Sequence, residues 1–230
     1  MKKKYYDKKY FQKRDHLDLH IAQTLEIFMH THHLKKTLDV GCGTGRLTKF
    51  LNEHGFDATG CDKEEQALRI ARKINKKSKI KKATADRLPF KNQTFDLVTS
   101  LSVIEHLTKK EANTFILETK RVLKKDGFIF IITPNFTSPM RYIKGKNWFG
   151  YSDPTHIQFF TPKTLSKLLQ NHGFQHIQLR FKTAKNVDFD WNLPKSTRSF
   201  PMPFKNFLNY LLIESPLATC RDSFWIAAQK

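Results

Sequence analysis

Three glycines, Gly41, Gly43 and Gly45, follow directly on an apolar run that begins at Leu38. Because glycine has no Cβ atom, this GxGxG spacing permits positive φ angles and lets a ligand approach the main chain closely. The next residues, RLTKFLNEHG (46–55), are typical of a helix. The segment therefore predicts a strand, a tight turn and a helix start that present bare backbone to a ligand.

An acidic residue, Asp62, ends the next predicted strand, about 20 residues beyond the glycines. Nucleoside-binding α/β units place a carboxylate on the ribose hydroxyls at this offset. Asp62 also stands where it would cap the following helix, 63–73, and the two roles are compatible. We interpret Asp62 chiefly as a ribose ligand, since the glycines and the carboxylate together are far more specific than either alone.

Several segments resemble, in chain order, the motifs of class I S-adenosylmethionine-dependent methyltransferases, including those of the ubiquinone-biosynthesis type. The glycine segment with Asp39 resembles the first motif, and Arg46 stands where a dinucleotide-binding fold would carry its third glycine. The later matches are ADRLPF (85–90), the fourth strand and its exit (95–107), and the fifth strand with its lead-in (121–135). The resemblance covers roughly residues 37–183.

This resemblance implies S-adenosylmethionine as cosubstrate and assigns a role to several residues. Asp39 would contact the ligand's amino group or hold the amides of the loop, and Asp86 would face the adenine amino group. Ala85 and Arg87 would supply backbone or packing beside Asp86. The residues expected to bind the cofactor are Asp39, Gly41, Cys42, Gly43, Gly45, Asp62, Lys63, Ala85, Asp86, Arg87 and Leu101.

The pair Glu105–His106 follows the fourth strand. In ubiquinone-type enzymes and in small-RNA 2′-O-methyltransferases, a similar ExxEH segment supplies metal ligands. In the small-RNA enzymes a later histidine completes the site, and its counterpart here is His156. Ser102 replaces the first carboxylate, and hard cations prefer several carboxylates. We therefore predict no metal ligand and keep a divalent metal as the alternative. The pair would then anchor the following helix or contact substrate.

His156 is the best candidate for a general base, with His106 as a second catalytic residue. Methyl transfer to a hydroxyl is an in-line displacement, in which the enzyme aligns the reactants and a base removes the hydroxyl proton. An imidazole suits this task at neutral pH. Asp153, three residues earlier, would orient the ring. The alternative is that His156 only braces the loop in which it lies.

These residues need a framework in which strands and helices alternate. The pattern predicts an α/β fold, a Rossmann-like, seven-stranded and mostly parallel sheet with helices on both faces and an antiparallel last strand. The expected strands are 37–41, 57–61, about 80–84, 95–100, 127–134, about 174–182 and 223–230. The expected helices include 17–34, 108–123 and a segment capped by Thr161, with Pro162 in its first turn and Gly173 past its end.

Two insertions interrupt this framework. The segment at about 135–160, rich in aromatics, is longer than ordinary connectors and is expected to form a lid over the cofactor site. A second insertion, about 184–215, contains a short apolar helix at 203–215, which would pack on the sheet edge or rest on a membrane surface. The predicted division is an N-terminal basic arm and helix (1–36) followed by a methyltransferase domain (37–230).

The chain carries a formal net charge of +20 at pH 7 and three cysteines. Such a positive charge would favour binding to RNA or to an anionic lipid surface. The alternative is that the basic side chains only face solvent. Lysine outnumbers arginine and no interleaved aromatic–arginine tract occurs, which weakens the nucleic-acid interpretation. No CxxC pair, secretory signal or apolar span is evident, and we expect a cytoplasmic protein. The oligomeric state is open.

The predicted function is S-adenosylmethionine-dependent O-methylation of a small molecule, such as a quinone or phenol, a sugar or a lipid-linked glycan. The alternative enzyme is an RNA 2′-O-methyltransferase that uses the basic surface. A third hypothesis is a cofactor-binding scaffold without activity, against which the intact glycine segment and the two downstream carboxylates argue.

Overall fold

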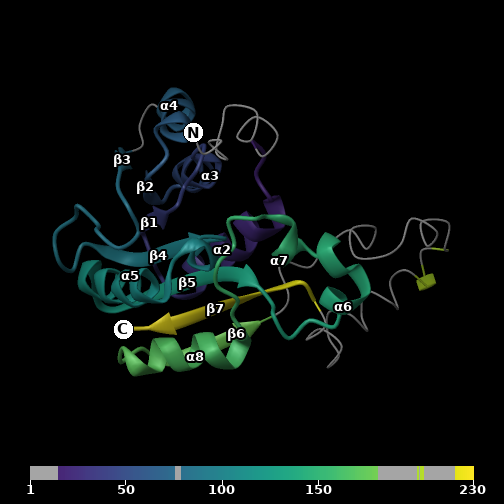
Figure 1. The fold of residues 1–230 in the computed structure, drawn as a ribbon. Helices are drawn as coiled ribbons and strands as arrows, with labels where there is room; N and C mark the ends of the chain where they lie inside the picture. Colours follow the sequence, from purple (N-terminus) through teal and green to yellow (C-terminus); the bar gives the residue numbers. More distant parts are fainter. Residues whose placement is uncertain (1–14, 76–78, 181–200, 202, 205–220) are drawn as a thin grey trace, which may run out of the picture.

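A seven-stranded sheet in the order β3-β2-β1-β4-β5-β7-β6 forms the centre of the protein (Figure 1). The computed structural model describes residues 15–75, 79–180, 201, 203–204 and 221–230. The strands are β1 (Lys36–Val40), β2 (Asp57–Asp62), β3 (Lys79–Lys82), β4 (Phe95–Leu101), β5 (Leu123–Pro134), β6 (Gln175–Arg180) and β7 (Ser223–Gln229). From β3 to β5 all neighbours pair in parallel, whereas β7 is antiparallel to both β5 and β6. The predicted fold class is confirmed.

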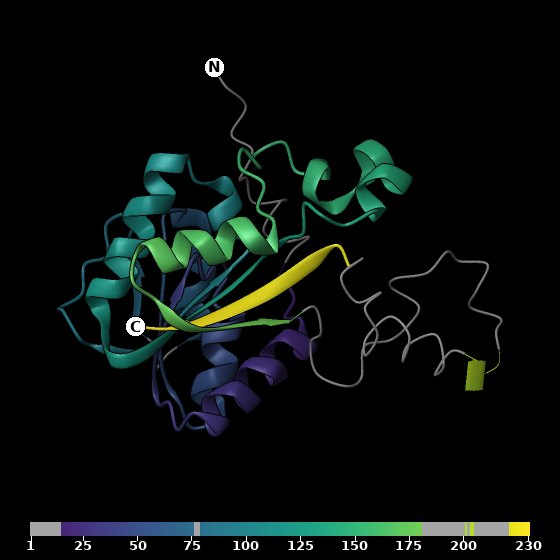
Figure 2. The same ribbon diagram turned by 90° about the horizontal axis from the view of Figure 1, so that it is seen from below.

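Helices cover both faces of this sheet. They are α2 (Leu19–Thr31), α3 (Arg46–Glu53), α4 (Glu65–Ile74), α5 (Lys109–Val122), α6 (Met140–Lys144), α7 (Phe149–Ser152) and α8 (Pro162–Asn171), with 3₁₀ turns η1 (Ile104–His106) and η2 (Gly145–Asn147). Figure 2 shows α2 and α8 on opposite sides of the sheet. The helices predicted at 17–34, at 108–123 and after Thr161 are thereby found, within a few residues at each end.

The alternation of side chains along β5 explains the two apolar layers. Phe128 and Phe130 point to the face covered by α2 and α3, whereas Ile129 and Ile131 point to the face covered by α5 and α8. Successive strand residues face opposite sides of a sheet, so an unbroken apolar run is required where both sides are buried. β5 is therefore a central strand, and it holds the end of β4 in a fixed position.

Two helices begin with the residues that the sequence indicates. Thr161 accepts a hydrogen bond from the Thr164 backbone N–H, and Pro162 occupies the first turn of α8. Thr108 and Glu111 form a reciprocal capping box at the start of α5. The capping box fixes the chain directly after Glu105 and His106, so these two residues lie between a buried strand and a well-anchored helix.

The lid (residues 135–160) contains α6, η2 and α7 and lies beyond the end of β5 (Figure 1). Its central side chain is Trp148, which is fully buried and donates a hydrogen bond from Nε1 to Asp222 Oδ1 at 2.9 Å. The ring packs against Tyr151, and Phe159 stacks on Phe136. Trp148 is therefore the centre of an aromatic cluster in the lid, whereas Tyr142, Phe149 and Tyr151 keep 72%, 41% and 39% of their surface exposed.

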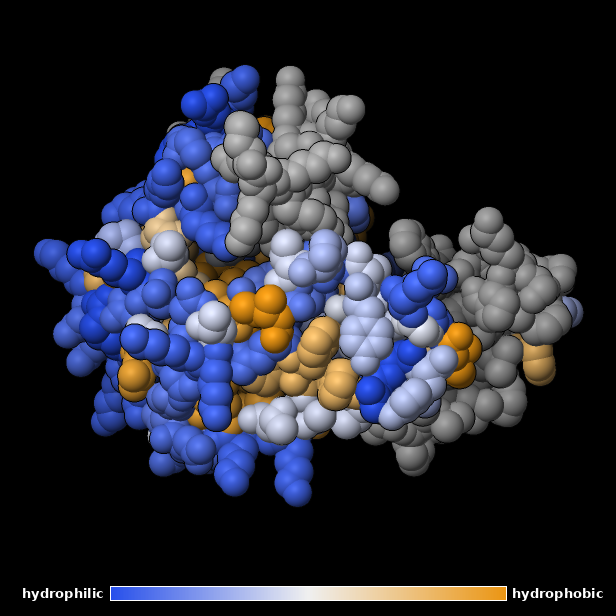
Figure 3. All heavy atoms as spheres, viewed as in Figure 1, coloured by the Kyte–Doolittle hydropathy of each residue, from blue (hydrophilic) through white to orange (hydrophobic). Residues whose placement is uncertain are grey.

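Hydrophilic side chains cover most of the face seen in Figure 3, with apolar side chains gathered along its middle. Within the part of the chain that is described, no helix has the length and apolar character needed to cross a membrane. The basic arm at 1–14 and nearly all of the insertion at 184–215, including its predicted helix, lie outside the described residues. The division into an arm and a domain stays a prediction.

Candidate cofactor and acceptor site

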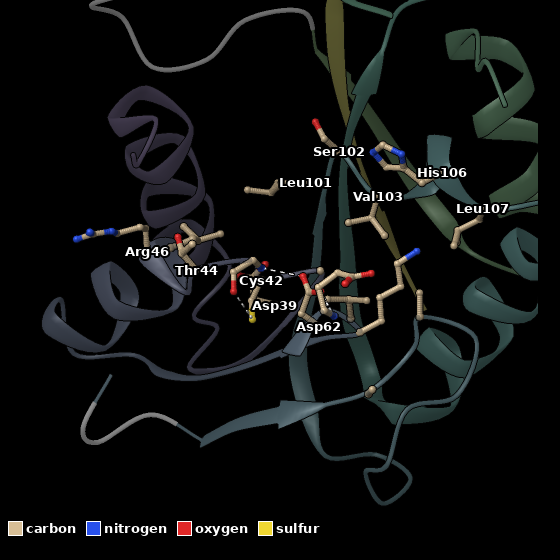
Figure 4. Close-up of a pocket in the computed structure, with 18 of the residues that line it drawn as sticks. Asp39, Cys42, Thr44, Arg46, Asp62, Leu101, Ser102, Val103, His106 and Leu107 are labelled. Atoms are coloured by element: carbon tan, nitrogen blue, oxygen red, sulfur yellow. Dashed lines mark hydrogen bonds between the residues drawn. The ribbon is translucent and has the colours of Figure 1, made fainter. Parts of the chain in front are cut away.

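A cavity of about 690 Å³ opens at the carboxyl ends of β1, β2 and β4. The chain reverses its direction of strand addition between β1 and β4, and open α/β sheets bind ligands at such a point. Figure 4 shows Thr44 and Arg46 at one end of this cavity and His106 and Leu107 at the other. The wall between them is formed by the glycine loop (41–45) and the end of β2.

The glycine loop has the backbone conformation that its sequence predicts. Gly41, Gly43 and Gly45 all have positive φ angles, of +75°, +52° and +76°. A Cβ on Gly41 would lie 2.3 Å from Val103 Cγ2, and one on Gly45 would lie 2.6 Å from Asn75 Nδ2. Side chains at these two positions are therefore excluded both by conformation and by space.

Asp62 holds the loop and faces the cavity at the same time. Its Oδ2 accepts a hydrogen bond from the Gly43 backbone N–H at 2.9 Å, and its Oδ1 accepts one from the Glu64 N–H at 2.8 Å. Burial raises the pKa of Asp62 above its usual value, and these two bonds oppose that shift. The helix-capping residue of α4 is Glu64, so Asp62 stands before the helix rather than at its cap.

Asp39 lies at the floor of the cavity with 3% of its surface exposed. Thr99 and Thr48 donate hydroxyl hydrogen bonds to its two oxygens at 3.0 and 3.3 Å. Burial raises the pKa of Asp39 to about 7, and the nearby Asp62 adds to the shift. A cationic group in the cavity would favour the ionised form of this carboxyl.

Most of the residues expected to bind the cofactor meet around this cavity. Those that line it are Asp39, Gly41, Cys42, Gly43, Asp62, Lys63, Ala85, Asp86 and Leu101. Gly45 and Arg87 do not line it: Gly45 caps α3, and the Arg87 N–H closes a turn onto the Thr84 carbonyl at 3.2 Å. These two positions shape the loops rather than the cavity surface.

The segment that precedes α2 lines the cavity although no pattern in the sequence predicts it there. His16, Leu17 and Asp18 line the cavity, and Asp15 next to them forms an ion pair with Arg46. Asp18 also caps α2 by accepting hydrogen bonds from the His20 and Ile21 backbone N–H groups. The capping aspartate was a usable signal for the helix start, but no local pattern indicates that the chain before it passes over the cavity.

Two histidines lie side by side at the other end. His106 lines the cavity, and its ring centroid is 4.7 Å from that of His156, which does not line it. His106 Nδ1 lies 3.2 Å from the Thr155 carbonyl oxygen, and His156 Nδ1 lies 2.7 Å from the Gly150 carbonyl oxygen. Asp153 Oδ1 accepts hydrogen bonds from the Thr155 backbone N–H and hydroxyl, and the orientation of His156 by Asp153 stays a prediction.

Glu105 is fully buried next to these histidines. Its Oε2 accepts a hydrogen bond from the Thr133 hydroxyl at 3.0 Å, whereas its Oε1 has no hydrogen-bond partner among the described residues. Its carbonyl oxygen accepts from the Ile157 and Gln158 N–H groups at 3.0 and 3.1 Å, which ties the end of the lid to the exit of β4. Burial raises the pKa of Glu105 to about 7.

Ser102, which replaces a carboxylate of the related motif, has a φ of +54°. A residue other than glycine in this left-handed region stores backbone strain, and such strain gathers at functional sites. Ser102 is also part of the cavity wall. The strained position thus lies where the glycine-loop end and the histidine end of the cavity meet.

The fold, the positive-φ glycine loop and the carboxylate at the end of β2 define an α/β protein that binds a nucleoside cofactor. A family model described as a methyltransferase domain matches residues 38–131. The chain belongs to the class I S-adenosylmethionine-dependent methyltransferases, and S-adenosylmethionine is its cosubstrate.

Curated relatives and solved structures agree with this family. A ubiquinone biosynthesis O-methyltransferase of Pelagibacter ubique is 31% identical over 171 residues, which is 70% of each chain. Its namesake from Bartonella bacilliformis is 28% identical over 170 residues, 70% of this chain and 68% of the relative. An S-adenosylmethionine-dependent methyltransferase of Archaeoglobus fulgidus has a similar fold, with a TM-score of 0.60, 22% identity and coverage of 91% and 94%.

Proposed function

We propose that the protein transfers the methyl group of S-adenosylmethionine to a hydroxyl group of a small molecule. The observation that carries this proposal is the pair of imidazoles, His106 and His156, beside the cofactor cavity. Methylation of a hydroxyl requires a proton acceptor close to the attacking oxygen, and neutral imidazole is suited to that role. The names of the curated relatives, which are O-methyltransferases, support the same reaction class.

On this proposal, the glycine-loop end of the cavity holds the cofactor. Asp62 would accept hydrogen bonds from the ribose hydroxyls, and Asp86 would face the adenine amino group. Asp39 would attract the amino group of the methionine part directly or through the loop amides. Cys42, Lys63, Ala85 and Leu101 would contribute the surrounding surface. The sulfonium would then point toward Ser102 and His106, where an acceptor would enter.

The chemical step is then a single in-line displacement. The acceptor oxygen attacks the methyl carbon, the carbon–sulfur bond breaks, and its electron pair returns to sulfur to give a neutral thioether. The acceptor proton passes to an imidazole nitrogen of His106 or His156 and then to solvent. Burial lowers the pKa of His106 below its ordinary value, which keeps that ring neutral and able to accept a proton at neutral pH.

Two measurements test the proposal. Titration calorimetry should detect binding of S-adenosylmethionine and of its demethylated product, and a panel of phenols, quinols and sugars should reveal methyl transfer to oxygen. His156→Ala should reduce kcat by about 10²–10⁴-fold with little change in cofactor affinity, as expected for loss of a general base. His54→Ala, an exposed histidine remote from the cavity, is the matched control. If His156→Ala also loses cofactor binding, the role of His156 is structural rather than catalytic.

RNA remains the second candidate substrate, because of the net charge of +20 and the exposed lysines of the edge strand β3, such as Lys79 and Lys82. Phosphate-driven binding weakens steeply as salt rises, so RNA affinity measured at a series of salt concentrations decides this alternative. Binding that is absent or independent of salt would leave these lysines as solvated surface.

A further inference from the structure

We propose that Arg121 and Glu118 are positioning residues that hold the loop with which the protein recognises the adenine of its cofactor. Both belong to the last turns of α5, and neither lines the cofactor cavity. The loop in question is the β3–β4 loop (residues 83–94), which carries Asp86. The inference rests on the part of the proposed function that places adenine against Asp86, and it adds what keeps Asp86 in place.

The Arg121 guanidinium binds its neighbour and the β3–β4 loop at the same time. Nε and Nη2 donate a parallel pair of hydrogen bonds to the Glu118 carboxylate, at 2.7 and 2.8 Å. Nη1 donates to the Phe90 carbonyl oxygen at 2.7 Å and to Asn92 Oδ1 at 2.9 Å. Nη2 also donates to the Leu88 carbonyl oxygen at 2.8 Å. These bonds use every N–H hydrogen that a guanidinium carries, so the side chain has one well-defined position.

Leu88 is held from both sides of its backbone. Its N–H donates to Glu118 Oε2 at 2.9 Å, while its carbonyl oxygen accepts from Arg121. The Leu88 side chain is buried in the apolar layer beneath α5. The side chains of Arg121 and Glu118 are only 32% and 21% exposed, and charge-assisted hydrogen bonds are stronger than neutral ones. The chain is therefore fixed two residues beyond Asp86.

The part of the loop that faces the cofactor lies between two anchors. Residues 83–86 line the cavity. At their start the Ala83 N–H donates to the Asp62 carbonyl oxygen at 3.0 Å, and shortly after their end comes Leu88 with its two bonds. A loop that is already ordered loses less conformational freedom when a ligand binds, which favours affinity. Release of the second anchor would weaken cofactor binding although no group that touches the cofactor is removed.

Other contacts hold the end of the loop when the Arg121 side chain is changed. The Gln93 N–H donates to the Arg121 carbonyl oxygen at 3.0 Å, and the Thr94 N–H donates to the Val122 carbonyl oxygen at 2.7 Å. These main-chain bonds do not depend on the guanidinium, and they lead the chain into β4. We therefore expect a local effect on the β3–β4 loop rather than loss of the fold.

Two ligands separate positioning from general destabilisation. They are S-adenosylhomocysteine and S-inosylhomocysteine, in which an oxygen replaces the adenine amino group. Wild type should prefer the adenine ligand, because a site built for one hydrogen-bonding group rejects an analogue that lacks it. Titration calorimetry with Arg121→Ala should show binding of the adenine ligand weakened about tenfold and of the inosine ligand about two- to threefold. A protein that is merely less stable would lose affinity for both ligands in equal proportion.

Conservative variants and a control refine the test. Arg121→Lys should not restore the preference, because one ammonium group cannot replace a planar fork of donors. Glu118→Gln keeps an acceptor for the Leu88 N–H and should retain more of the preference than Glu118→Ala. Lys124→Ala removes another ion pair, that with Asp96 at 2.7 Å, which lies outside the β3–β4 loop. This control should leave both affinities unchanged. Thermal unfolding verifies that each variant is folded, and Glu118→Gln carries the test if Arg121→Ala does not fold.

Asp86→Ala makes failure of this inference distinguishable from failure of the proposed placement of adenine. If Asp86→Ala narrows the preference while the Arg121 and Glu118 variants keep it, the inference is overturned and the placement stands. If the Arg121 variant narrows the preference while Asp86→Ala keeps it, the positioning role stands and Asp86 is not the group that recognises adenine. A wild-type protein that binds both ligands equally overturns both.

Discussion

Arg46 and Asp15 join the start of α3 to the chain that precedes α2. The guanidinium donates two parallel hydrogen bonds, from Nε to Oδ1 and from an Nη2 hydrogen to Oδ2, each 2.8 Å long. Both side chains are partly shielded from solvent. The paired geometry holds His16 and Leu17 against the cavity, so this ion pair closes the glycine-loop end of the cavity.

The first prediction concerns this closure. Arg46→Ala should release bound S-adenosylmethionine about two- to fivefold faster, because a partly exposed ion pair contributes up to about 1 kcal/mol. Stopped-flow displacement by the demethylated product measures the rate. Lys49→Ala, which removes an exposed pair with Glu53 on the same helix, should leave the rate unchanged. An unaltered rate in Arg46→Ala would show that the pair does not retain the cofactor.

The second prediction concerns Asp62. Asp62→Ala should lower the affinity for S-adenosylmethionine by about 10- to 100-fold, since hydrogen bonds to a charged group contribute about 1.5–3 kcal/mol. The variant also loses the acceptor that holds the Gly43 N–H. Titration calorimetry gives the affinity, and Asp57→Ala, at the exposed start of the same strand, is the control. Equal affinities in the two variants would contradict the ribose role.

The third prediction is a pH dependence of stability due to Asp39. Its pKa is about 7 in the folded protein and about 3.9 in an unfolded chain. Between these values the native state holds a proton that the unfolded state has lost, so this carboxyl's contribution to the free energy of unfolding falls as pH rises from 4 to 7.

Asp39→Asn removes this contribution, and comparison with wild type isolates it from other titrating groups. Urea unfolding of the cofactor-free proteins gives the free energy of unfolding at pH 5 and at pH 8. From pH 5 to pH 8 this free energy should fall more in wild type than in Asp39→Asn, by on the order of 2 kcal/mol. Parallel falls in the two proteins would mean that Asp39 ionises normally.

The fourth prediction concerns the packing of the lid. A Cβ on Gly150 would lie 1.9 Å from Trp148 Cζ3, so Gly150→Ala must displace the buried ring. Overpacking of this kind costs about 1–3 kcal/mol. Because the Gly150 carbonyl oxygen orients His156, kcat should fall while cofactor affinity is retained. Tryptophan fluorescence and thermal unfolding report the displacement of the Trp148 ring and its cost in stability. Ser152→Ala, at an exposed site in the same helix, is the control. Normal stability would show that the ring moves at no cost.

The glycine-loop half of the cavity was largely predictable from sequence because its determinants are local. Glycines at 41–45 require one backbone conformation, and a carboxylate at the end of a parallel strand reaches the neighbouring loop whatever the rest of the chain does. The pairing of Thr161 with Pro162 is local in the same sense. Such local patterns can be recognised in the sequence without knowledge of the tertiary structure.

The histidine end of the cavity and the segment before α2 depend instead on contacts between residues that are distant in the sequence. Asp15 meets Arg46 across 31 residues of chain, and His106 meets the Thr155–His156 segment across about 50. No periodic pattern in the sequence predicts these contacts, because they depend on the path that a long loop takes in the folded protein. For the same reason the sequence did not indicate that the Gly150 carbonyl oxygen lies at hydrogen-bond distance from His156 Nδ1.

The two amide bonds onto the Glu105 carbonyl oxygen have a consequence for how this scaffold diversifies. They fix the point at which the loop returns to the sheet, just after the stretch that carries Gly150 and His156. Residues 142–147 lie earlier in the loop and are exposed, so changes of length or composition there should leave His156 beside His106. The loop can in this way vary while the two histidines stay together.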